Sequence, residues 1–122
     1  MNLAMHTESN IETAINIGLS IRQIIADHSQ GLMSNREYQI LEFIVVEHLG
    51  NRRVVMEQGM GLRHLGSRYT LRKAIQTLID QDFVAIQESE DSRLRPLVPT
   101  EHALHLFASI GDRIGSLVVS SS

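Results

Sequence analysis

The stretch Ser67–Asp80, SRYTLRKAIQTLID, determines how the rest of the sequence is interpreted. Apolar residues recur in it at positions i, i+3, i+4, i+7 and i+8, namely Leu71, Ala74, Ile75, Leu78 and Ile79. This spacing places them on one face of an α-helix, and Ser67 is of a type that caps helix N-termini. The sequence therefore predicts a strongly amphipathic helix.

The opposite face of this helix is polar and basic. With Leu71 at the centre of the buried face, the residues that point away from it are Tyr69, Arg72, Lys73 and Gln76, and Arg68 lies near the exposed N-terminal end. A helix in the major groove of DNA reaches base edges with such side chains, and Arg or Lys binds guanine or phosphate while Gln binds adenine. An ordinary solvated helix face has a similar composition. The neighbouring segments are therefore needed to distinguish a DNA-reading helix from a merely solvated one.

A second helix is predicted upstream. Ser34 followed by Glu37 has the spacing of a capping box, and the next apolar residues keep helical spacing as far as Gly50. Val54–Val55 then favours a short strand.

The residues between this strand and Ser67 are harder to assign. Gly59 and Gly61 disfavour a helix interior, so we expect only a short, irregular helix around Leu62–Leu65. Gly66 provides a turn. Two helices joined at Gly66, the second strongly amphipathic, indicate a helix-turn-helix.

A β-hairpin is predicted directly after the amphipathic helix. Phe83–Gln87 favours a strand, Glu88–Arg93 a polar turn and Leu94–Val98 a returning strand. Because Pro96 and Pro99 lack a backbone N–H, we expect the returning strand at a sheet edge. A hairpin in this position makes the helix-turn-helix a winged one.

Apolar helices are predicted at both ends of the chain. Ile11–Asp27 is apolar on several sides, and Thr100 caps a final helix rich in apolar residues. Together they expose more apolar surface than one small core absorbs, which marks an interface. The expected fold is mainly α with a small β-hairpin wing, in which a winged helix-turn-helix (34–99) is flanked by N- and C-terminal dimerisation helices (9–29 and 100–119).

The composition is that of a globular cytoplasmic protein. The 122 residues suit one domain, 1–122, with 43% hydrophobic and 20% charged residues. No apolar run approaches the ~20 residues of a membrane span, and the N-terminus lacks the pattern of a signal peptide. Because cysteine is absent, disulfides and thiolate metal ligands are excluded.

Positive charge is concentrated in one window. Six of the eleven Lys and Arg residues lie between Arg52 and Lys73 together with one acid, Glu57, so this window carries +5 and the rest of the chain −8. The net charge of −3 does not argue against a nucleic-acid partner, because binding needs only one basic face.

No enzyme, metal or cofactor site is predicted. His102 and His105 have a spacing that can hold a metal, but no second pair or carboxylate cluster joins them. The sequence has no G-x-S-x-G, Walker or dinucleotide glycine motif. We therefore expect a protein that is not an enzyme, without catalytic residues, metal or cofactor.

About residues 34–119 resemble the MarR family of winged-helix regulators. The resemblance is carried by Ser67–Arg72 running into Leu78, by Phe83–Val84, by Asp91-Ser92-Arg93 and by Pro99–Ala103. In that family a recognition helix is followed by a strand, a wing tip of acid-x-arginine, a second strand and a threonine that opens a dimerisation helix. The spacing from the wing tip to Thr100 is the most specific part of the match.

The resemblance implies roles for two wing residues. Arg93 corresponds to the arginine that enters the minor groove, whose potential attracts such a side chain, and Asp91 to the acid that orients it through an ion pair. The sequence departs from the family at Asp82, where glycine is usual, and in the acidic wing residues Glu88 and Glu90, where the family often has basic residues.

The residues and the resemblance together predict a homodimeric transcriptional regulator, a repressor, that binds double-stranded DNA sequence-specifically. Its operator is expected to be an inverted repeat with half-sites about one helical turn apart. The predicted DNA contacts are Ser67, Arg68, Tyr69, Arg72, Lys73, Gln76, Arg93 and Arg95.

The alternative is a winged-helix module that does not bind DNA and uses its acidic hairpin against a protein partner. The acidic wing and the negative net charge favour it. Members of the family that the chain resembles often bind a small-molecule effector between the dimerisation helices and the winged domain, but no residue here identifies one.

Overall fold

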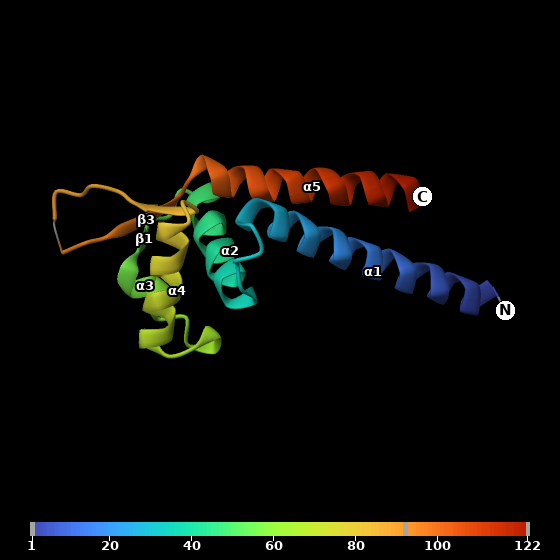
Figure 1. Ribbon diagram of the computed structural model, residues 1–122, viewed down its shortest axis with the longest axis horizontal. Helices are drawn as coiled ribbons and strands as arrows, with labels where there is room; N and C mark the ends of the chain where they lie inside the picture. The colour runs from blue at the N-terminus through green and yellow to red at the C-terminus, as the bar shows by residue number, and fades with distance from the viewer. Residues whose placement is uncertain (1, 92, 122) are drawn as a thin grey trace. The chain divides into compact units, whose positions relative to one another are not determined.

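The computed structural model describes residues 2–91 and 93–121, which form two compact units. Unit 1 contains the described residues up to Leu32 and from Leu106 onward, and unit 2 contains Met33–His105. In chain order the elements are α1 (Asn2–Ser29), α2 (Asn35–Leu49), β1 (Val54–Val55), α3 (Met56–Met60), the 3-10 turn η1 (Arg63–Leu65), α4 (Arg68–Asp80), β2 (Val84–Ile86), β3 (Pro96–Pro99) and α5 (Glu101–Ser121). Figure 1 labels all of them except η1 and β2.

Unit 2 is a winged helix-turn-helix. The fold class, mainly α with a small antiparallel sheet, is the one that the sequence predicts. The predicted N-caps of α2 and α4 are confirmed: Ser34 and Glu37 form a reciprocal capping box at α2, and the Ser67 hydroxyl accepts a hydrogen bond from Thr70 N at α4, 3.2 Å. Gly66 precedes this cap at φ +152°, a backbone conformation that only glycine adopts easily.

The core of unit 2 lies where α2, α4 and the sheet meet. Its fully buried side chains come from all three, and each contributes about 1.5–3 kcal/mol through removal from water. They include Ile40, Leu41, Ile44, Leu71, Ile75, Leu78, Phe83 and Val84. Because α4 buries the face centred on Leu71, its polar face is turned outward.

The first helix of the helix-turn-helix differs from the prediction. The regular helix is α3, Met56–Met60, and the predicted segment around Leu62–Leu65 forms only η1. Gly59 is buried, and a Cβ at this position would lie 2.7 Å from Ile75 Cδ1. Its low helix propensity is therefore offset by the close packing of α3 on α4 that it permits.

The prediction of an edge position for the returning strand is wrong, because β3 is central in the sheet order β1-β3-β2. The Pro96 carbonyl still accepts from Gln87 N, 2.9 Å, at the end of the β2 side of the ladder. On the β1 side the ladder ends at the pair Val54–Leu97, so Pro99 lies beyond it. The missing N–H groups therefore fall at the ladder's ends, where they interrupt no central hydrogen bond.

Unit 1 consists of α1 and most of α5. α1 begins earlier than the predicted helix, at Asn2 instead of Ile11, and α5 begins after Thr100, as predicted. The Thr100 hydroxyl accepts from Ala103 N, 3.2 Å, and donates to the Asp82 carbonyl, 2.6 Å. A bilayer crossing would need a longer or more apolar helix than any in the described residues.

Gly59→Ala is expected to lower the free energy of unfolding by about 1–3 kcal/mol, because overpacking against Ile75 outweighs the better helix propensity. In an Ile75→Val background, which lacks the clashing Cδ1 atom, the same change should cost less or be stabilising. Urea unfolding of the four combinations measures the coupling.

Gly111→Ala is the matched control, because a Cβ there would lie within 4 Å of no described atom beyond its chain neighbours and the adjoining backbone of α5. The change should stabilise the protein by up to about 1 kcal/mol. Equal effects of Gly59→Ala in both Ile75 backgrounds would contradict the packing argument.

Candidate nucleic-acid interface

The outward face of α4 carries the predicted base-reading residues. All are exposed, and Tyr69 is the most prominent large side chain, with 69% of its surface accessible. Lys73 Nζ lies 4.9 Å from the centroid of the Tyr69 ring, a distance at which the ring attracts the ammonium group. The exposed face comprises Arg68, Tyr69, Arg72, Lys73 and Gln76.

Two of these residues already have acidic partners. Arg68 Nη2 lies 2.6 Å from Glu57 Oε2, and Gln76 Nε2 donates to Asp80 Oδ1, 2.9 Å. Within the described part of the chain, Arg72 and Lys73 form no ion pair with a carboxylate. These two cations are therefore directly available to an anionic partner.

Ser67 has a structural use of its own. Its hydroxyl accepts from Thr70 N and donates to Thr70 Oγ1, 3.0 Å. The Arg36 guanidinium also donates to the Leu65 carbonyl, 2.7 Å, and so supports the turn that precedes the cap. The start of α4 is thus fixed from two sides.

A concave surface of about 240 Å³ lies between α4 and the wing, and we call it the helix–wing groove. Among the described residues that line it are three exposed arginines, Arg72 from α4 and Arg93 and Arg95 from the wing, and a single acid, Glu57. The Arg95 carbonyl accepts from Met56 N, 3.0 Å, which ties the base of the wing to the start of α3. The fold thus brings together predicted site residues from two separate segments.

The other described residues that line the helix–wing groove are apolar. They are Val55, Met56, Met60 and Leu94. Apolar neighbours lower the local dielectric constant and so strengthen the attraction of a cation for an anion. Because Arg93 is already paired with Asp91, most of this attraction comes from Arg72 and Arg95.

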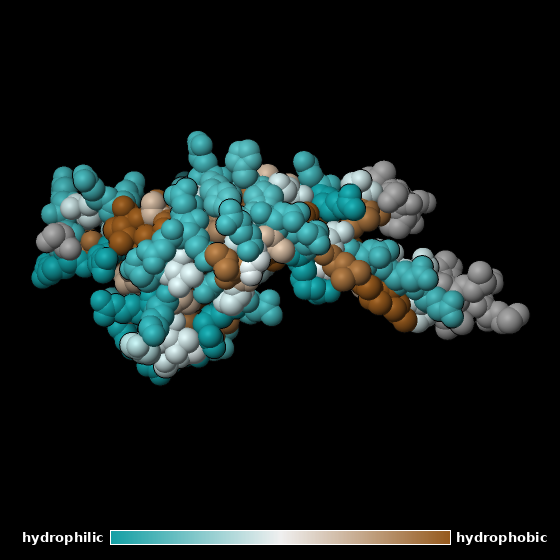
Figure 2. All heavy atoms as spheres, in the orientation of Figure 1, coloured by the Kyte–Doolittle hydropathy of each residue, from teal (hydrophilic) through white to brown (hydrophobic). Residues whose placement is uncertain are grey.

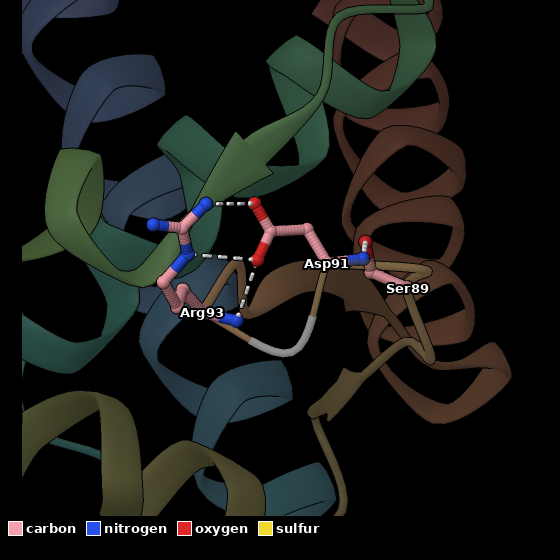
Figure 3. Close-up of polar contacts among 3 residues, drawn as sticks. All are labelled: Ser89, Asp91 and Arg93. Atoms are coloured by element: carbon pink, nitrogen blue, oxygen red, sulfur yellow. Dashed lines mark hydrogen bonds and ion pairs between the residues drawn. The ribbon is translucent and has the colours of Figure 1, made fainter.

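The wing tip holds Arg93 by an ion pair, which Figure 3 shows. Arg93 Nε and Nη2 lie 3.1 and 3.2 Å from the two carboxylate oxygens of Asp91, and Arg93 N donates to the same carboxylate, 3.0 Å. The hydrogen bonds from the Arg93 side chain, and then its backbone, lower the pKa of Asp91. Asp91 N in turn donates to Ser89 Oγ, 3.3 Å. Ser92 lies outside the described residues.

The basic window of the sequence does not form one surface. Arg52 pairs with Glu47, 2.6 Å, and together with Arg53 lines a different hollow, beside His48 and Gln87. No described residue lines both this hollow and the helix–wing groove. Part of the +5 charge read from the sequence therefore lies elsewhere in unit 2.

Asp82, which departs from the glycine usual in the resembled family, has φ +64°. A left-handed conformation at this position explains the preference for glycine, and Asp is among the residues that tolerate it. The Asp82 carbonyl is also held by Thr100, so the corner between α4 and β2 is fixed.

The two histidines considered as metal ligands have other surroundings. His102 stacks on the buried Phe83 ring, with centroids 4.3 Å apart, and His105 is exposed. Across residues 2–91 and 93–121, His, Asp and Glu side chains form no group of three that could hold a metal ion.

No protein-family model matches the chain, and no curated protein matches it. Among solved structures, the chain is similar to the adhesin competence repressor (AdcR) from Streptococcus pyogenes. The TM-score is 0.46 and the identity 19%, with 93% of this chain and 77% of that chain covered. A similarity at this level carries no argument on function. The winged helix-turn-helix itself is the architecture that the resemblance to the MarR family implied.

Glu57 and Asp80 were not among the predicted site residues. For Glu57, the signal in the sequence was that it is the one acid inside the basic window, Arg52 to Lys73. For Asp80, the signal was its position four residues after Gln76, a spacing at which helical side chains contact each other.

The pKa of Asp91 should lie below its ordinary value of 3.8 and return toward it in Arg93→Gln, because that change removes the side-chain hydrogen bonds. The ion pair is complete above the lowered pKa and is lost as the pH falls through it. A carboxyl-carbon NMR titration measures both values. Arg95→Gln, which leaves the Asp91–Arg93 contacts in place, is the control, and an equal shift in both variants would argue against this cause.

Proposed function

We propose that the protein is a homodimeric transcriptional regulator, a repressor, that binds double-stranded DNA sequence-specifically. The observation that carries the proposal is the helix–wing groove, in which Arg72 of α4 and Arg93 and Arg95 of the wing surround one concavity. Two cationic elements on either side of a groove suit a sugar–phosphate strand that runs between the major and minor grooves of a duplex.

In this proposal α4 enters the major groove. Arg68, Tyr69, Arg72, Lys73 and Gln76 then face base edges or phosphates, and Ser67 lies at the N-terminal end closest to the DNA. Arg93 enters the adjacent minor groove, and Arg95 contacts the backbone between the two grooves. The Asp91 carboxylate limits the positive charge of the wing but fixes the direction of Arg93.

The exposed apolar face of α1 supports a dimer. Ile11, Ile15 and Leu19 are 52%, 54% and 54% exposed and follow one another at four-residue spacing. Figure 2 shows the corresponding brown band along α1. A continuous apolar stripe on a charged molecule marks an interface, and a two-fold partner would pair two α4 helices with an inverted repeat.

Arg72→Ala is expected to weaken binding to a promoter duplex by roughly 5- to 150-fold, through loss of a base-edge or phosphate contact. The measurement is fluorescence anisotropy with labelled DNA from the region upstream of its own coding sequence, at two salt concentrations. Wild-type affinity should fall as salt rises, with a log–log slope of about −0.9 for each phosphate contacted.

The matched control is Arg53→Ala, because Arg53 is exposed in the same unit but lies outside the helix–wing groove. Its affinity should stay close to that of the wild type. Unchanged DNA affinity in Arg72→Ala would count heavily against the assigned surface.

Ile15→Glu is expected to convert the dimer to a monomer, because a carboxylate would then be buried in the apolar stripe. Analytical ultracentrifugation measures the mass, and the affinity for an inverted-repeat duplex should fall with it. Asn16→Glu, a neighbouring exposed position, should leave the dimer intact. A wild-type protein that sediments as a monomer would contradict the dimer proposal.

The acidic wing supports a second candidate, a winged-helix module that binds a protein and not DNA. Glu88 and Glu90 are exposed in the wing beside the neutralised Arg93. Glu88→Gln combined with Glu90→Gln separates the two functions: a DNA-binding wing gains duplex affinity, whereas a protein-binding module stays without measurable duplex binding.

A further inference from the structure

Glu57 occupies an unusual position for an acid. Of the described residues that line the helix–wing groove, it is the one with a carboxylate, and Arg72, Arg93 and Arg95 line the same groove. Its Oε2 atom lies 2.6 Å from Arg68 Nη2. The Arg68 side chain is 58% exposed and the Glu57 side chain 70% exposed. An exposed ion pair of this kind adds little to the stability of the fold. Stability therefore does not explain why a carboxylate lies on this basic surface.

The partner of Glu57 is the first residue of α4. Side chains at the N-terminal end of a recognition helix reach base edges, and arginine reads guanine through O6 and N7 with two parallel N–H donors. Glu57 accepts from Nη2, and the guanidinium has further N–H donors that remain for a second partner. The ion pair therefore orients Arg68 without saturating it.

The same carboxylate disfavours a phosphate as that second partner. A phosphate that approached Arg68 would meet the negative charge of Glu57, whereas a guanine edge is neutral and presents acceptors only to the arginine. Binding to unrelated DNA consists almost entirely of phosphate contacts, so a carboxylate at this point weakens it selectively.

We propose that Glu57 is a positioning residue that directs Arg68 to a base edge instead of to the phosphate backbone, and thereby determines sequence specificity. The inference rests on the proposed DNA-binding function. It adds a role for α3, whose first turn carries Glu57, in what α4 reads.

The experiment is selection from a library of randomised duplexes, carried out in parallel with the wild-type protein and with Glu57→Gln. The wild type should select an inverted repeat. Glu57→Gln should lose the base preference at one position in each half-site, by about tenfold or more, while the other positions keep theirs. Its affinity for a shuffled duplex should rise, with a salt slope steeper by about one phosphate contact.

Glu47→Gln is the matched control. It removes the same charge from another arginine pair in unit 2, Glu47 with Arg52, which lies outside the helix–wing groove. This variant should select the wild-type sequence. Glu57→Asp keeps a carboxylate and should restore part of the lost preference, and the urea midpoint of Glu57→Gln should match that of the wild type.

The outcomes separate the inference from the function on which it rests. If Glu57→Gln selects the wild-type sequence, or binds selected and shuffled duplexes more tightly by the same factor, Glu57 is a general repellent and the inference is overturned. If the wild-type protein selects no sequence and binds no duplex, the proposed function itself fails, and the inference fails with it.

Discussion

Burial of one face of α4 fixes the direction of every side chain on its opposite face. Leu71, Ile75 and Leu78 are fully buried in unit 2, so rotation of α4 about its axis would expose apolar surface at a cost of several kcal/mol. The polar face consequently has one orientation relative to α3 and to the sheet. Because this rotation is prevented, Arg72 lines the same groove as the two wing arginines, Arg93 and Arg95.

Local sequence signals were sufficient for the capped helices α2, α4 and α5, because the helical period and the cap are encoded within a few neighbouring residues. They failed for α3, where the propensity of Gly59 opposes a helix and its contact with Ile75, from another element, decides the outcome. They also failed for the position of β3. A proline rule considers each residue alone, whereas the register determines whether a missing N–H matters.

The candidate site was predictable to a similar depth. Exposure of the polar face of α4 follows from helical periodicity, and the family resemblance supplied the Asp91–Arg93 pair at the wing tip, which is present. The pairing of Arg68 with Glu57 could not be predicted from the sequence, because it depends on the position of α3 and on how closely α3 approaches α4. Charge counted along the sequence likewise combined arginines that lie on different surfaces.

The central place of β3 has a consequence for how the chain acquires its structure during synthesis. Among the described residues, β1 and β2 pair only with β3, which is the last of the three strands along the chain and so the last of them to be synthesised. Until Pro99 has emerged, β1 and β2 both remain without their neighbour, and the wing has no second arm. A chain that ended before β3 would therefore present two strands without their neighbour, and unpaired strand edges favour misassembly.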